Sequence, residues 1–193
     1  MSEVDPISAF DALFARAKKT SVKEPNACVL ATVDAKGRPS ARVVLLKGAD
    51  PQGFVFYTNL NSRKGRELRA TRHAALCFHW PELEAQVRVE GDAAQVTDPE
   101  ADAYFASRQR GSQVGAWASQ QSEPLATRAE LDRRVAEIEA RYAGQSVPRP
   151  PHWSGFRLTP QQVEFWYGRP NRLHERTLYT RQGDQWRTEL LYP

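Results

Sequence analysis

Two cations flank the most apolar stretch of the sequence. Arg42 and Lys47 stand at either end of residues 43–46, four consecutive branched aliphatic residues that predict a strand buried on both faces. Cations seldom lie this close to a protein core unless an anion pairs with them. Side chains alternate along a strand, so positions 42 and 47 point to opposite faces of a regular one. We therefore expect an anion near each cation, and a bend or bulge near Leu46 or Lys47 if both serve one cleft.

A second group of cations follows in the segment NLNSRKGRELRAT. Asn61 or Ser62 is a candidate N-cap for a short helix whose first turn carries Arg63 and Lys64. Positive side chains oppose the helix dipole at this end, but a bound anion reverses the sign of that interaction. A phosphate dianion requires forked guanidinium donors and a compact ammonium of this kind. The alternative is that Arg63, Lys64 and Arg66 form a solvated helix face.

The segment YFASRQRGSQ offers another anion-binding set. Tyr104 and Arg108 are four residues apart and share a face of a predicted helix. Ser112 follows in a predicted loop, where its hydroxyl and its backbone N–H are expected to reach the same oxygen. In the alternative interpretation, Arg108 is a cation at an exposed helix C-terminus.

A fourth set lies in the segment NRLHER. Arg172, His174 and Arg176 alternate, so an extended conformation projects all three side chains from one face. Three potential cations on one face repel each other unless they meet an anion. Together with aromatic residues such as Trp166, these sets indicate a phosphorylated cofactor and a phosphorylated substrate.

Several common site patterns are absent from the sequence. No Lys-Ser/Thr follows GADPQGF, and there is no GxGxxG after a predicted strand, no HExxH and no GxSxG. The four histidines show no metal-ligand spacing, so no metal is expected. Cys28 and Cys77 predict two buried thiols in a reducing cytosol.

Composition indicates a cytoplasmic globular protein. A chain of 193 residues with 40% hydrophobic content is long enough to form one domain with a substantial core. The net charge of +4 comes without a long Lys/Arg run, so nucleic acid is not an expected partner. The N-terminus lacks an apolar signal core, and no apolar run approaches the ~18 residues that span a bilayer. We expect a soluble, cytoplasmic protein without membrane contact.

Local signals predict helices and antiparallel strands around these residues. Helices are expected to begin at Asp5, at Asp98 and at Thr127, each a candidate cap. A hairpin turns at DAKG, where Gly37 supplies positive φ. Further strands are predicted in FVFYT, AALCFHW, EAQVRVEGDAAQV, GFRL, QVEFWYG, TLYTR and QWRTELL. Since strands do not alternate regularly with helices, the sequence favours an α+β, mainly β fold, an antiparallel barrel with flanking helices.

Six segments, taken in order, resemble the pyridoxamine/pyridoxine 5′-phosphate oxidase family, FMN enzymes that make pyridoxal 5′-phosphate. They are RVVLLKG, FYTNLNSRKG, QVRVEG, SRQRGSQVGAWASQQS, PPHWSGFRLTPQQVEFW and RLHER. The likeness runs from about residue 25 to residue 193, behind an N-terminal helix and lead-in at 1–24. It implies a single FMN-binding split-barrel domain over 1–193, and a homodimer with FMN in a cleft at the subunit interface.

The resemblance also implies a role for each matching residue. FMN is expected to be held by Arg42, Val43, Val44, Leu45, Leu46, Lys47, Tyr57, Thr58, Arg63, Lys64, Gln86, Gln121, Ser122, Trp166 and Arg176. The substrate is expected to contact Lys47, Tyr104, Arg108, Ser112, Arg172, Leu173 and His174. Arg172 is the expected catalytic residue that orients the pyridine ring and stabilises charge in the transition state, with His174 assisting.

The reaction that the resemblance implies oxidises C4′ of pyridoxamine or pyridoxine 5′-phosphate. Molecular oxygen takes the electrons to give hydrogen peroxide, and the amine substrate releases ammonia. Two departures from the family pattern stand out: Ala85 replaces the usual Arg, and the chain starts close to its first helix, without a segment expected to close over substrate. The rival interpretations are a split-barrel flavin oxidase with another substrate, such as a phenazine-pathway enzyme, and a non-catalytic module that binds flavin or nucleic acid.

Overall fold

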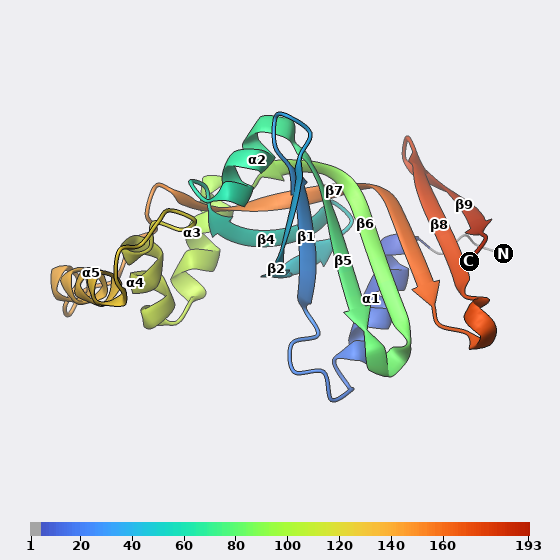
Figure 1. The fold of residues 1–193 in the computed structure, drawn as a ribbon, viewed down its shortest axis with the longest axis horizontal. Coiled ribbons are helices and arrows are strands. Elements are labelled where there is room, and N and C mark those ends of the chain that lie inside the picture. Colours follow the sequence, from blue (N-terminus) through green and yellow to red (C-terminus); the bar gives the residue numbers. More distant parts are fainter. Residues whose placement is uncertain (1–4) are drawn as a thin grey trace.

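The computed structural model describes residues 5–193, which form a curled antiparallel sheet with helices beside it (Figure 1). The strand order is β2-β1-β5-β6-β7-β4-β3, with β8 paired to β7 and β9 paired to β8. The strands are β1 (Ala27–Val33), β2 (Pro39–Leu45), β3 (Gly48–Asp50), β4 (Gly53–Asn59), β5 (His73–Trp80), β6 (Ala85–Gln95), β7 (Trp153–Tyr167), β8 (Glu175–Gln182) and β9 (Gln185–Leu191). The predicted mainly β, antiparallel architecture is confirmed.

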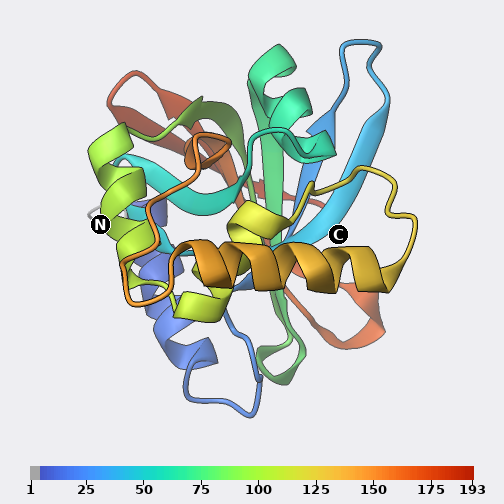
Figure 2. The same cartoon turned by 90° about the vertical axis from the view of Figure 1, so that its left-hand side faces the viewer.

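The helices gather mostly at one end of the sheet. They are α1 (Pro6–Ala17), α2 (Arg63–Thr71), α3 (Asp98–Ser107), α4 (Arg110–Ala118) and α5 (Arg128–Arg141), with short 3₁₀ turns η1 (Pro81–Leu83) and η2 (Pro170–Arg172). In Figure 1, α3, α4 and α5 lie at the end opposite the β8–β9 hairpin. Figure 2 shows α5 crossing in front of α4 at that end. The molecule therefore has a helical end and a hairpin end, joined by β7.

Helix starts follow the local signals closely. Asp5, Ser62 and Thr127 each accept a backbone N–H from the first turn of the helix that follows, as expected of N-caps. The predicted cap Asp98 is wrong by one residue. Thr97 has the extended backbone of an N-cap, and its hydroxyl accepts the Glu100 N–H. Asp98 is therefore the first helical residue.

Strand β7 is one element where the sequence predicted two. It pairs with β6 over residues 156–167, with β4 over residues 153–158 and with β8 over residues 162–167. Pro160, which lies between the two predicted strands, is opposite Gly91 where the β6–β7 register shifts. A Cβ on Gly91 would come within 2.0 Å of the Thr159 carbonyl oxygen, so this close approach requires glycine.

Two apolar clusters fix the sheet and the helices. In the larger one, α1 inserts Phe10 between Phe54 and Phe78, with ring centres 4.9 and 5.0 Å apart. Fully buried aromatic rings such as these are major contributors to core energetics. The second cluster joins α3, α4 and α5 to the start of β7 through Phe105, Val114, Ala118, Ile138 and Trp153. The three helices at the helical end therefore pack against the first residues of β7.

The apolar run at 43–46 is not buried on both faces, which corrects the sequence-based expectation. Strand β2 lies at an edge of the sheet beside β1, and the Val43 side chain is 65% exposed. Leu46 is buried, but it lies beyond the end of β2. The regular strand is interrupted where a bend was expected, because β2 ends at Leu45 and the Lys47 N–H donates to the Val55 carbonyl of β4. Arg42 thus lies where β2 pairs with β1, whereas the backbone of Lys47 bonds to β4.

Some general features concern only the described residues. Residues 5–193 contain no group of three or more side chains placed to hold a metal ion. In the same range, none of the helices is both long and apolar enough to cross a membrane. Cys28 is buried and Cys77 half-buried, both as free thiols. Burial raises the pKa of Cys28 to about 12, and the charge of the nearby Cys77 makes a smaller contribution in the same direction. The Cys28 thiol is therefore unreactive near neutral pH.

Candidate functional site

A cleft lies where β2, β4, α3 and α4 meet, and its volume is about 630 Å³. Its walls bring together residues from three of the predicted sets and further residues expected to hold FMN. They are Val43, Val44, Leu45, Lys47, Tyr57, Thr58, Lys64, Tyr104, Arg108, Ser112 and Gln121. The cleft has the size and the mixed apolar and cationic lining of a site for small anionic ligands.

A stack of aromatic rings forms one wall of the cleft. The Tyr57, Tyr104 and Trp153 rings lie nearly parallel to one another, with centroid distances of 4.0 Å (Tyr57 to Tyr104), 5.3 Å (Tyr57 to Trp153) and 6.1 Å (Tyr104 to Trp153). Lys47 Nζ is 5.9 Å from the Tyr104 ring centre, and the Arg108 guanidinium is 4.8 Å from the Trp153 ring. Cations held against ring faces are well placed and still free to bind an anion.

Arg108 has an unused donor at this end of the cleft. Within residues 5–193, its buried Nη1 has no hydrogen-bond partner. Burial lowers the pKa of the Arg108 guanidinium, and the effect of Tyr104 only partly opposes it. A buried cationic donor without a partner is costly, so an anionic ligand such as a phosphate would satisfy it. The geometry favours the anion-binding interpretation of Arg108 over the exposed helix end.

The surroundings of Arg108 differ from the sequence-based prediction in two details. Arg108 follows the end of α3 in an extended conformation, so it does not share a helical face with Tyr104. Ser112 is not in a loop but in the first turn of α4, where its N–H donates to the Gln109 carbonyl. Only the Ser112 side chain is left to meet a ligand.

The other end of the cleft is formed by the start of α2 and the segment after α4. Lys64 Nζ donates to Gln121 Oε1 at 2.7 Å, and Thr58 Oγ1 donates to the same oxygen at 3.3 Å. The Arg63 backbone N–H donates to Ser122 Oγ at 3.1 Å. Burial, and to a lesser degree the charge of Arg42, lowers the pKa of Lys64. An anion bound here would offset both effects.

Arg42 already has an anionic partner inside the protein. Its guanidinium donates to Thr32 Oγ1 and Ser40 Oγ, each at 2.5 Å, and lies 3.5 Å from the Glu67 carboxylate. Glu67 is 5% exposed and also accepts from Arg63 Nε at 2.8 Å. One buried carboxylate therefore connects two of the cations predicted to hold FMN. Sequence analysis missed Glu67, although its spacing of four from Arg63 was a usable signal.

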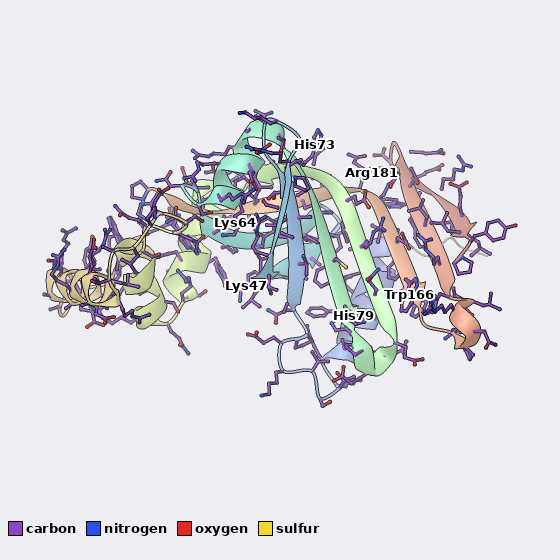
Figure 3. The ribbon with its side chains drawn as sticks, in the orientation of Figure 1. Lys47, Lys64, His73, His79, Trp166 and Arg181 are labelled. Atoms are coloured by element: carbon purple, nitrogen blue, oxygen red, sulfur yellow. The ribbon has the colours of Figure 1, made fainter. Side chains whose placement is uncertain are left out.

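A second group of predicted residues lies at the hairpin end. Figure 3 shows Trp166 well away from Lys47 and Lys64. Trp166 pairs with Gln86 on β6 and with Arg176 on β8, and its ring centre is 4.6 Å from His174. Leu173, in the same turn, is 67% exposed. Within one chain, the predicted residues thus form two separate groups.

The segment 170–176 corrects the expected extended conformation. Residues 170–172 form η2, and Asn171 and Arg172 have φ values of 58° and 61°. The chain must reverse here between antiparallel β7 and β8, and Pro170 starts the turn. His174 Nδ1 accepts from the Arg169 N–H, whereas Arg176 Nε donates to Glu164 at 2.8 Å. Arg172, His174 and Arg176 therefore do not project from one face of a strand.

The cleft also contains residues that sequence analysis did not single out. They are Asn59, Gln109, Gly115, Ala116, Ser119 and Trp153. Trp153 had a signal, since it stands in PPHWSG directly before a predicted strand. No sequence signal pointed to Gly115 and Ala116, because a small residue lines a cleft only as a result of how distant elements pack around it.

Comparison with known proteins decides the family. A family model described as "Pyridoxamine 5'-phosphate oxidase" matches residues 14–167. The chain belongs to this family. A second model, "Pyridoxine 5'-phosphate oxidase C-terminal dimerisation region", matches residues 153–193 and so covers the whole hairpin end. The region that matches this second model therefore includes Trp166, Arg172, His174 and Arg176, the predicted site residues at the hairpin end.

Named relatives agree with this assignment. A pyridoxine/pyridoxamine 5′-phosphate oxidase of Myxococcus xanthus is 65% identical over 189 residues, covering 98% of this chain and 92% of the relative. The corresponding protein of Rubrobacter xylanophilus is 57% identical over 192 residues, covering 100% of this chain and 88% of the relative. Among solved structures, PhzG from Burkholderia lata 383 in complex with tetrahydrophenazine-1-carboxylic acid has a TM-score of 0.94 at 36% identity, covering 100% and 94% of the two chains. A related FMN-binding protein from Nostoc punctiforme, with a TM-score of 0.79 at 20% identity and full coverage of both chains, shares the split-barrel fold.

Proposed function

We propose that this oxidase uses FMN and oxygen to convert pyridoxamine 5′-phosphate and pyridoxine 5′-phosphate to pyridoxal 5′-phosphate in the cytoplasm. The observation that carries the proposal is a single cleft with cationic groups at two ends, Lys64 at one and Arg108 at the other. Two separated anion sites suit a phosphorylated cofactor next to a phosphorylated substrate. The names of relatives 57–65% identical over nearly the whole chain support the same reaction.

The residues around Lys64 fit the FMN phosphate. Arg42, Arg63 and Lys64 outnumber the one carboxylate among them, Glu67, and this leaves a positive surplus for a dianion. Gln121, Ser122 and Thr58 supply polar atoms beside these cations. The apolar edge residues 43–45 line the cleft and would lie against the isoalloxazine ring. When bound, FMN supplies the two-electron chemistry that joins substrate oxidation to the reduction of oxygen.

The residues around Arg108 fit the substrate phosphate. Arg108 offers its unpartnered Nη1, Lys47 an ammonium, and Tyr104 and Ser112 hydroxyl groups. These groups would hold the phosphate and so fix the position of C4′ in the cleft. A substrate that lacks the phosphate loses this anchor, and its KM is expected to rise steeply.

We assign Arg172 and His174 to the site of a second copy of the chain. In one chain they lie at the hairpin end, inside the dimerisation region and away from the cleft. A symmetric homodimer with FMN at the interface would bring the turn of one subunit over the cleft of the other, and do so twice. Arg172 would then orient the pyridine ring and stabilise developing charge, with His174 assisting. Gln86, Trp166 and Arg176 would complete the cofactor site from the same side.

Peroxide production tests the proposal against the phenazine alternative that the PhzG likeness raises. The purified protein is expected to be yellow with bound FMN and to form hydrogen peroxide from pyridoxine 5′-phosphate and from pyridoxamine 5′-phosphate. Unphosphorylated pyridoxine serves as the control and should be a poor substrate. Peroxide from a reduced phenazine precursor, but from neither B6 phosphate, would establish the alternative.

A further inference from the structure

Two arginines from outside α3 hold the acidic side of that helix. Arg157 Nη2 donates to Glu100 at 3.1 Å, and Arg149 donates to Asp98 at 2.7 Å and to Asp102 at 2.6 Å. Both arginine side chains are largely buried, with exposed fractions of 19% and 13%. The orientation of α3 is therefore set by β7 and its lead-in as well as by apolar packing.

Arg157 also binds the strand that follows Lys47. Its Nη1 donates to both carboxylate oxygens of Asp50, at 2.8 and 2.7 Å. Asp50 ends β3, and its Oδ1 also accepts the N–H groups of Gln52 and Gly53, which closes the turn into β4. The hydrogen bonds from Arg157 and from these N–H groups outweigh the effect of burial and lower the pKa of Asp50. Only a planar guanidinium can satisfy two carboxylates in this fixed arrangement.

The two partners of Arg157, Asp50 and Glu100, each lie within four residues of a residue that lines the cleft. Glu100 lies one helical turn before Tyr104, and Asp50 lies three residues after Lys47. We propose that Arg157 is a positioning residue that sets the separation of Lys47 and Tyr104, and through it the affinity for the substrate's phosphate group. This inference rests on the proposed function of the cleft. Arg157 acts through Asp50 and Glu100 and not by contact with substrate.

The test compares Arg157→Gln and Arg157→Lys with the unmodified holoenzyme. Both variants are expected to raise the KM for pyridoxine 5′-phosphate about 10-fold, since displacements near 1 Å in positioning groups have effects of this order or larger. The kcat and the FMN Kd, measured by quenching of flavin fluorescence, should stay within about twofold, because the Lys64 end does not depend on this ion pair. Arg128→Gln, which removes an exposed ion pair with Asp132 on α5, is the matched control and should change none of these values.

Several outcomes would overturn the positioning role. An unchanged KM would do so, and so would a KM and an FMN Kd that rise together, because that pattern indicates general loosening. In a double-mutant cycle, adding Glu100→Gln to Arg157→Gln should raise KM no further, whereas fully independent effects would contradict action through Glu100. Failure to turn over pyridoxine 5′-phosphate by the unmodified protein would overturn the proposed function as well, so the two failures are distinguishable.

Discussion

Glu67 shows at the scale of one residue how the FMN end of the cleft is built. Its buried carboxylate accepts from Thr32 at 2.5 Å, from Ser40 at 2.6 Å and from Arg63 at 2.8 Å. Thr32 and Ser40 are 35 and 27 residues away in sequence, so local patterns could not predict these contacts. The anion expected near Arg42 exists, but it belongs to the protein itself. In the proposed site, these contacts would hold the Arg42 guanidinium in place before FMN binds.

The lowered pKa of Glu67 makes stability depend on pH. Burial alone would raise this pKa, but hydrogen bonds from Ser40, Thr32 and Arg63 outweigh burial and hold it at about 2, against an ordinary value of 4.5. A depressed folded-state pKa contributes stability that is complete above about pH 4.5 and is lost as the pH falls toward 2. Glu67→Gln is therefore expected to lower the free energy of unfolding by about 3 kcal/mol at pH 7 and by much less at pH 2.

Urea unfolding of the wild type and of Glu67→Gln at the two pH values measures this effect. Glu123→Gln is the control, since Glu123 forms an exposed pair with Arg66 and should cost little at either pH. A cost for Glu67→Gln that is the same at pH 7 and pH 2 would contradict the assigned cause.

At the scale of secondary-structure elements, the sequence predicts what local chemistry decides. The hairpin of β1 and β2 and the caps at Asp5, Ser62 and Thr127 were predictable, because each depends on residues within a few positions. The edge position of β2 and the continuity of β7 were not, because both depend on which distant strands pair. Pro160 suggests the end of a strand unless the irregularity beside it is known, where Gln161 of β7 has no partner on β6.

Gly155 in β7 makes room for the aromatic stack of the cleft. A Cβ at this position would lie 2.8 Å from Cδ1 and Cε1 of Tyr57, so Gly155→Ala must displace a ring that packs against both Tyr104 and Trp153. We expect a loss of about 1–3 kcal/mol in the free energy of unfolding, typical of overpacking, and weaker FMN binding. Thermal unfolding and a flavin titration measure both quantities.

A matched glycine and a second background make the Gly155 prediction specific. Gly111→Ala in α4 is the control, because nothing lies within 4 Å of its added Cβ and alanine favours the helix. In a Tyr57→Ala background, most of the cost of Gly155→Ala should disappear. A cost that persists there would show that the strain lies in the backbone of β7 instead.

At the scale of the whole molecule, the predicted site residues fall into two groups at opposite ends of β7. Sequence order could suggest that the residues serve one site, and the family resemblance implied a dimer. Neither could show which residues each subunit supplies, because that depends on where β7 carries the hairpin end relative to the cleft. We infer that the cleft group and the Arg172 group form one site, in which a second copy of the chain supplies one of the two groups.

Mixed dimers test that claim most directly. Arg108→Met disables the proposed cleft and Arg172→Ala the proposed turn, and two different affinity tags allow the heterodimer of these chains to be purified. If each site combines the cleft of one subunit with the turn of the other, the heterodimer has one intact site of the two that symmetry provides, and about half of the wild-type turnover of pyridoxine 5′-phosphate is expected. If both groups serve the same chain, every site in the heterodimer carries a defect. Turnover no higher than that of the two parent homodimers would contradict the shared site.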